Sequence, residues 1–295
     1  MLYFRRASLP GFDKAPMWDV FTFFFRGLKN GALTTRASAV AYNFFLAVFP
    51  AFIVLFTLIP YIPISNFQEV LLSTIKDFLP INVFYTVKDT LEEIVTKKRT
   101  GLLSLGFLFA LIFASNGISA LIVAFNASYH HVESRKWIYQ QLVAVLLVWI
   151  FCFLMAMAVI MIIFSGWFID FLELKDIITN KFVIAMLNNG KWLIILSMIF
   201  MGFSFLYYLA PARRQKFRFI SAGSSLGTLF MVLTSVGFSA YVNNFGQYNK
   251  LFGSIGTLIA FLIWIYVNSL VILIGFELNA SIKNAGFNQT EKQQI

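Results

Sequence analysis

The residues of this sequence that could carry acid–base or metal chemistry are few. His130, His131 and Glu133 lie close together. Adjacent side chains on a helix point about 100° apart, however, so the two histidines lack the spacing of a metal pair. A phosphate-binding glycine loop and a nucleophile elbow are also missing from the sequence. We therefore expect no catalytic residue, no metal and no cofactor, and a membrane nuclease built on the histidine pair is disfavoured.

Glu277 is the one ionisable residue that we assign to an apolar segment of membrane-spanning length. It lies near the end of the last such segment, on the same helical face as Tyr266. Proton and cation pumps place carboxylates or histidines at membrane depth, so the shortage of such groups argues against a conventional proton relay. Two interpretations of Glu277 stay open: an anchor at the membrane–water boundary, or a buried functional carboxylate.

Uncharged polar side chains recur at helical spacing in the apolar segments. The clearest series has spacings of four, three, seven and four residues, which puts its hydroxyls on one helical face. Such faces could line a hydrated groove. Alternatively, the hydroxyls bond to carbonyls of their own helix, and Gly223 and Gly227 allow close helix packing. The candidate path residues are Ser221, Ser225, Thr228, Ser235 and Ser239, with Ser115, Ser119, Asn126 and Asn268 from other segments.

Two further features could bind a substrate. Pro50 interrupts the first apolar segment close to Asn43, so we predict a helix that is kinked or broken there. A broken helix exposes backbone groups to a substrate, whereas a kink can also serve packing alone. The second feature is a short basic stretch that either sets the topology or binds anionic headgroups. It contains Arg213, Arg214, Lys216 and Arg218.

The elements that must position these residues are membrane-spanning helices. The chain has 295 residues, is 59% hydrophobic and is only 12% charged, whereas about a quarter of a soluble domain is charged. Backbone in hydrocarbon must satisfy its own hydrogen bonds, so runs of about 20 apolar residues predict helical spans. Six runs qualify, approximately 37–62, 101–125, 138–168, 192–210, 219–242 and 253–278.

The distribution of Lys and Arg predicts the orientation. With the N-terminus in the cytoplasm, 14 of the 23 Lys and Arg residues fall on the cytoplasmic side, as short basic loops prefer. Lys97, Lys98 and Arg99 before the second span argue the other way. We expect both termini in the cytoplasm.

Two segments have amphipathic spacing. Trp18, Phe21, Phe25 and Leu28 recur at three, four and three residues, which predicts an N-terminal helix lying in the membrane interface. The external segment 64–100 predicts a helix pair hinged at Pro80, which could cover an opening or pack as a plain cap. The predicted fold is all-α: a polytopic membrane helix bundle with residues 1–36 as N-terminal segment, 37–280 as membrane domain and 281–295 as polar tail.

Several short stretches of the sequence recur in a characteristic order and spacing: Ala41-Tyr42 with Phe49-Pro50, Asn126, Tyr207-Tyr208-Leu209 with Pro211, Gly223, Phe252-Gly253-Ser254, Trp264 and the run from Gly275 to Ala280. Together they resemble the YihY/virulence factor BrkB family of bacterial membrane proteins. The resemblance covers roughly residues 36–280. Two substitutions depart from the family pattern: Phe252 stands where Tyr is common, and Ala212 where Asn is common.

The resemblance implies six spans and a bacterial cytoplasmic membrane, with transport, including movement of lipids, among the activities proposed for the family. It supplies no catalytic residues. From it and the polar faces we predict a transporter or flippase-like protein for a lipid or other amphiphile. The alternative is a structural or assembly factor that transports nothing. Expected partners are membrane lipids, including those with anionic headgroups, and a protein that drives transport or accepts the substrate. Nucleic acid is not expected as a partner, and the oligomeric state stays open.

Overall fold

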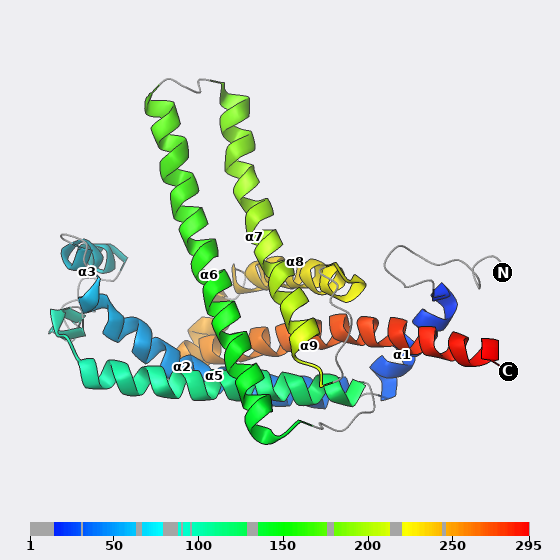
Figure 1. The fold of residues 1–295 in the computed structure, drawn as a ribbon. Helices are drawn as coiled ribbons and strands as arrows, with labels where there is room; N and C mark the ends of the chain where they lie inside the picture. The colour runs from blue at the N-terminus through cyan, green and yellow to red at the C-terminus, as the bar shows by residue number, and fades with distance from the viewer. Residues whose placement is uncertain are drawn as a thin grey trace. The chain divides into compact units, whose positions relative to one another are not determined.

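The protein is described by a computed structural model in which the regular structure is helical (Figure 1). No strand occurs among the described residues. The predicted all-α membrane bundle is therefore confirmed. The described residues are 15–30, 32–62, 67–78, 88–89, 91–94, 96–128, 135–175, 180–212, 220–243 and 246–294.

The chain divides into two compact units, and α2 and α5 contribute residues to both. The larger unit comprises Met1–Ala41 with Ile118–Ile295, and the smaller comprises Tyr42–Gly117. The helices are α1 (Met17–Asn30), α2 (Leu33–Leu58), the 3-10 turn η1 (Ile59–Tyr61), α3 (Phe67–Phe78), α5 (Thr100–Ser128), α6 (Trp137–Leu174), α7 (Lys181–Leu209), α8 (Ala222–Asn243) and α9 (Gly246–Gln294).

Six helical segments within the described residues are long and apolar enough to cross a membrane. They agree in number and order with the six spans predicted from hydropathy. The first begins four residues before its predicted range, and the third and last end six and eight residues after theirs. The segments are Leu33–Tyr61, Thr100–Ser128, Trp137–Leu174, Asn189–Leu209, Ala222–Tyr241 and Leu258–Gly286.

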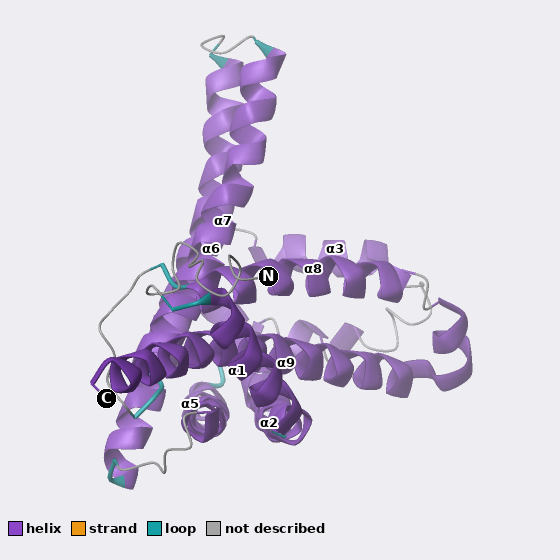
Figure 2. Cartoon of the chain, turned by 90° about the vertical axis from the view of Figure 1, so that its right-hand side faces the viewer, coloured by secondary structure: helices purple, strands orange, loops and turns teal. Residues whose placement is uncertain are grey.

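Within the larger unit, three helix pairs make the main contacts. α6 and α7 run side by side as a hairpin, as Figure 2 shows, and α8 packs along α9. The α8–α9 pair is antiparallel, because Gly223 meets Gly275 near one end and Phe238 contacts Trp264 further along. α1 packs on the C-terminal part of α9.

The smaller unit joins the rest of α2 to the start of α5. Gly117 lies against the ring of Phe44, and Gly106 lies against Ile53, so the two helices pack closely where α5 has glycine. The hydroxyls of Tyr61 and Thr100 share a hydrogen bond of 2.8 Å at the ends of these helices.

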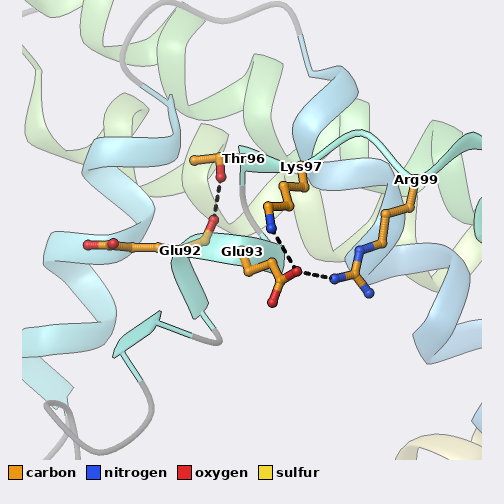
Figure 3. A network of polar contacts seen from close by, with 5 residues as sticks. All are labelled: Glu92, Glu93, Thr96, Lys97 and Arg99. Carbon is orange, nitrogen blue, oxygen red and sulfur yellow. Dashed lines mark hydrogen bonds and ion pairs between the residues drawn. The ribbon is translucent and has the colours of Figure 1, made fainter.

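A small ion-pair network precedes α5 in the same unit (Figure 3). Lys97 Nζ and Arg99 Nη2 both donate to Oε1 of Glu93, at 3.0 and 2.6 Å, and Thr96 donates to the Glu92 carbonyl. These bonds lower the pKa of the Glu93 carboxyl, chiefly through the hydrogen bond from Lys97 and then that from Arg99.

Of the two effects predicted for Pro50, the break does not occur, because α2 continues as one helix from Leu33 to Leu58 with Pro50 inside it; the kink stays a prediction. Proline removes one helical hydrogen bond. A true break in an apolar span would leave several backbone groups unsatisfied, so continuing the helix costs less.

The predicted amphipathic segments are helical where they are described. α1 covers the predicted interfacial helix, and α3 covers the first helix of the external pair. Residues 88–89, 91–94 and 96 are also helical, whereas the Pro80 hinge lies outside the described residues. The polar tail is helical to Gln294 as a continuation of α9.

Candidate functional site

The N-terminus of α8 is capped by its own serines and by a side chain of α9. Ser221 Oγ accepts a hydrogen bond from the Ser224 amide at 3.1 Å, which is the usual role of a serine before a helix. Asn279 Oδ1 accepts the Gly223 amide at 2.8 Å, and Asn279 Nδ2 donates to Ser221 Oγ at 3.0 Å. One asparagine thus satisfies a free amide of α8 and fixes the register of α8 against α9.

Glycines allow α8 and α9 to approach each other beside this cap. A Cβ atom on Gly223 would meet the Gly275 carbonyl, and a Cβ atom on Gly227 or Gly275 would meet the hydroxyl of Tyr207. That hydroxyl donates to the Ile272 carbonyl at 2.8 Å. Close packing through Gly223 and Gly227, one of the two interpretations from the sequence, is therefore present in the fold.

Buried aromatic rings join α5, α7 and α9 next to the glycines. The rings of Phe125 and Phe276 stack with centroids 4.0 Å apart, and both residues are fully buried. Tyr207 contacts each of them, with centroids 5.7 Å away in both cases. Such a packed cluster holds three helices at fixed positions.

Two arginines donate to carbonyls at the C-terminal ends of helices. Arg36 Nη1 donates to the Ala124 carbonyl at 2.7 Å and to Ser128 Oγ at 2.9 Å, in the last turn of α5. Arg135 Nη2 donates to the Ala210 carbonyl at 2.7 Å, just past α7. Both cations therefore lie where a helix has unpaired carbonyls and the negative end of its dipole.

Asn126 belongs to the same end of the larger unit. Its Oδ1 accepts the Ala212 amide at 2.9 Å, and the residue is almost fully buried. The side chain ties the last turn of α5 to the residues that follow α7. Asn126, a predicted path residue, thus has a structural role, because its side chain joins two elements of the fold.

Glu277 is buried, with 5% of its surface exposed. Its carboxylate lies against Gly27 of α1, where a Cβ atom would overlap Oε1. A Coulombic attraction also links it to the guanidinium of Arg36. Buried charges need such partners, and this one lies inside the Leu258–Gly286 segment.

Within the predicted ranges Glu277 is the one charged residue, but the helices extend beyond these ranges and bring further charged residues into the spanning segments. Arg36 was counted with the N-terminal segment, but α2 begins at Leu33, so Arg36 lies within the first spanning segment. The hydropathy run gave no sign of this, because a helix can start one turn before its apolar residues. Sequence reasoning also missed the contact between Gly27 and Glu277. The one sequence feature that could have indicated it is a glycine within the amphipathic helix.

The predicted hydroxyl face of α8 divides into buried and exposed members. Thr228 is buried and donates to the Ser224 carbonyl, whereas Ser225 and Ser235 are exposed and donate to the Ser221 and Met231 carbonyls. Ser239 is exposed as well. The hydroxyls of Ser225, Thr228 and Ser235 therefore all bond within their own helix, as one of the two interpretations expected.

The other predicted path residues are buried or partly buried. Asn268 is buried and donates to the Trp264 carbonyl at 2.8 Å, while its Oδ1 has no hydrogen-bond partner among the described atoms. Ser119 donates to Gln141 Oε1 at 3.4 Å. In the smaller unit, Ser115 and Pro50 are buried and Asn43 is partly buried.

Several predicted residues lie outside the described part of the chain. They are His130, His131 and Glu133 and the basic residues Arg213, Arg214, Lys216 and Arg218. Among the residues that are described, no group of three or more His, Cys, Asp or Glu side chains could hold a metal ion.

Similarity to known proteins extends over nearly the whole chain, including the buried cluster formed by the rings of Phe125, Tyr207 and Phe276. The family profile described as "Virulence factor BrkB" matches residues 24–294. The chain belongs to the virulence factor BrkB family. In this BrkB-family chain, four pieces that carry the sequence resemblance, Asn126, Tyr207, Gly223 and the run from Gly275 to Ala280, lie in or beside the buried cluster.

Curated relatives of this BrkB-family chain include a putative ribonuclease-like protein YfkH of Bacillus subtilis, 29% identical over 83% of this chain and 88% of that protein. A UPF0761 membrane protein of Idiomarina loihiensis is 27% identical over 70% of this chain and 69% of its own. Another UPF0761 membrane protein, from Alteromonas mediterranea, is 23% identical over 92% of this chain and 90% of that protein. No solved structure matches the chain. The family and the six apolar helices together identify a multi-pass membrane protein.

Proposed function

We propose that this protein moves a lipid or another amphiphile across the membrane, with the polar headgroup passing along α8. The observation that supports the proposal best is the exposed serine side of a spanning helix, formed by Ser225, Ser235 and Ser239. Exposed side chains of a spanning helix face lipid or a hydrated groove. A headgroup that follows these serines keeps hydrogen-bond partners while its tails stay in hydrocarbon.

The internal hydrogen bonds of the serines are compatible with this role. Ser225 and Ser235 donate their hydroxyl protons to carbonyls of α8. Each oxygen retains lone pairs that can accept a hydrogen bond from a headgroup. The serines would therefore act as acceptors along the path.

Thr228 interrupts the exposed path because it is buried between Ser225 and Ser235. Movement of a headgroup past this level requires α8 to shift against its neighbours. The α8–α9 contact through Gly223 and Gly275 is the nearest fixed point for such a shift.

The test is reconstitution of the purified chain into vesicles that carry fluorescent lipids, followed by the rate at which inner-leaflet lipid becomes accessible to an external quencher. The variant Ser225→Ala/Ser235→Ala/Ser239→Ala should slow this rate at least about tenfold, because it removes three acceptors worth about 1 kcal/mol each. The matched control is Ser165→Ala/Ser197→Ala, two serines of α6 and α7 that also bond within their helices.

A structural or assembly role is the second candidate. It is favoured by the glycine contacts of α8 and by the hydroxyls of Thr228 and Ser269, which are buried and bond within their own helices. No lipid movement in vesicles of native lipid composition, or equal rates for both serine variants, would contradict the transport proposal. Cross-linking of the native chain to one stable protein partner would then favour the assembly role.

We also propose that both termini lie in the cytoplasm and that the membrane is the bacterial inner membrane. Six spans put both ends on one side, and most Lys and Arg residues are then cytoplasmic. Reporter fusions that are active only in the cytoplasm or only outside it, joined after Gln294, test the orientation.

A further inference from the structure

Helix α1 has two apolar sides with different surroundings. One side is docked: Val20 is fully buried and packs with Leu278, Ile282 and Ala285 of α9. Phe23 and Phe24 are partly buried against the same cluster. This docked side accounts for why α1 stays on α9, whereas the opposite side of α1 is exposed among the described residues.

The opposite side carries three large exposed side chains. Trp18 is 59% exposed, Phe21 42% and Phe25 63%. The rings of Phe21 and Phe25 stack with centroids 6.4 Å apart, so they form one continuous surface. Basic residues flank it: Lys29 is exposed and Arg26 lies over the Phe23 ring. Aromatic rings beside basic groups are typical of helices that bind an anionic membrane surface.

The position of α1 on α9 identifies the membrane as the occupant. The α9 residues under α1, from Leu278 to Ala285, belong to the last part of the Leu258–Gly286 spanning segment. A helix docked there lies at the level of the lipid headgroups. Its exposed aromatic side therefore continues the lipid-facing surface of the spans.

The docked side of α1 also covers Glu277. Gly27 lies directly against the carboxylate, and the short connection through Ala32 joins α1 to α2 four residues before Arg36. Ala32 has φ 47°, a left-handed conformation that non-glycine residues rarely adopt. The chain thus passes within a few residues from the helix that covers Glu277 to the helix that carries Arg36.

We propose that α1 is a lipid-binding lid: its exposed aromatic and basic residues bind the surface of an anionic bilayer, and its docked side closes over Glu277. The contact with lipid then holds the lid in place, so the surrounding membrane controls access to this buried carboxylate. This inference stands independently of whether the protein moves lipid.

The lipid contact is tested with the full chain in nanodiscs. Cys152, the single native cysteine, is replaced by alanine, and Phe25→Cys carries an environment-sensitive fluorophore. Lipids with a quencher near the headgroup should quench this label strongly, and more strongly in phosphatidylglycerol than in phosphatidylcholine. Arg26→Gln/Lys29→Gln should reduce the preference for the anionic lipid roughly 30-fold, since each charge near the surface contributes about 1 kcal/mol, or about fivefold.

The lid is tested by hydrogen exchange of backbone amides. Phe21→Ser/Phe25→Ser should speed exchange at least about tenfold in residues 17–30 and 277–285, because α1 loses its lipid contact. The matched control is Phe164→Ser/Phe168→Ser, a stacked, exposed pair of the same spacing on α6, which should leave both segments unchanged.

Three results would overturn the proposal. A label at position 25 that lipid quenchers do not reach, but that is shielded from water, would identify a protein as the occupant. A label freely accessible to water would show that neither lipid nor protein covers this side of α1. Lipid quenching together with unchanged exchange over 277–285 in the Phe21/Phe25 variant would show that α1 binds lipid without acting as a lid.

Discussion

Gly27 of α1 lies directly against the carboxylate of Glu277 on α9, in the space that a Cβ atom would otherwise fill. Arg36 of α2 supplies the attracting positive charge. Three elements thus meet at one buried carboxylate. Each of them can be changed without touching the other two.

Gly27→Ala should lower the free energy of unfolding by about 1–3 kcal/mol, because the added methyl group overlaps Glu277 and pushes α1 away from α9. Detergent-titrated unfolding measures the effect. Gly286→Ala is the matched control, since a Cβ atom there meets nothing within 4 Å. It should be neutral or stabilising by up to about 1 kcal/mol, because alanine favours helix. Equal losses for both variants would contradict the contact.

Arg36→Gln should destabilise the protein by about 3 kcal/mol, because it leaves the Glu277 charge buried without its cation. Glu277→Gln alone removes the charge and should cost less. The double variant should be more stable than the sum of the two single losses predicts, by at least about 1 kcal/mol. Strict additivity in this double-mutant cycle would show that the two side chains do not interact.

Asn279→Ala should cost about 1 kcal/mol, because the Gly223 amide at the start of α8 loses its acceptor. Hydrogen exchange should accelerate at residues 222–225 and stay unchanged near Asn243. Gly223→Ala should cost about 1–3 kcal/mol through its clash with the Gly275 carbonyl, whereas Gly237→Ala, with open space around it, should not. A neutral Gly223→Ala variant would mean that α8 and α9 do not approach closely there.

The Glu93 network should respond to pH and salt. Its hydrogen bonds from Lys97 and Arg99 lower the pKa of the Glu93 carboxyl in the folded chain below its value in the unfolded chain. The network therefore stabilises the fold above the unfolded pKa, and this stabilisation is lost as pH falls through the folded pKa. Carbon-13 NMR of the labelled carboxyl should show the lowered pKa. Lys97→Met/Arg99→Met should raise it, and high salt should weaken the shift because the group is exposed. A pKa unchanged by the double variant would contradict the network.

The sequence by itself determined the membrane-spanning helices and their order, because the cost of unsatisfied backbone in hydrocarbon leaves few alternatives for long apolar runs. The same argument explains why α2 passes through Pro50 unbroken. The amphipathic spacing of Trp18, Phe21 and Phe25 also predicted a helix correctly. Each of these inferences depends on the chemistry of one segment alone.

Only the tertiary structure decided which polar residues belong together. Arg36 and Glu277 are 241 positions apart in the sequence, and their attraction depends on the packing of α2, α1 and α9. The sequence placed Asn279 only in the run from Gly275 to Ala280, whereas the fold shows that it accepts the Gly223 amide of α8. Helical periodicity shows which side chains share a face, but it carries no information about which helix that face meets. Glu277 is buried because α1 packs against it. Hydropathy could not decide whether this carboxylate is buried, and the tertiary structure does.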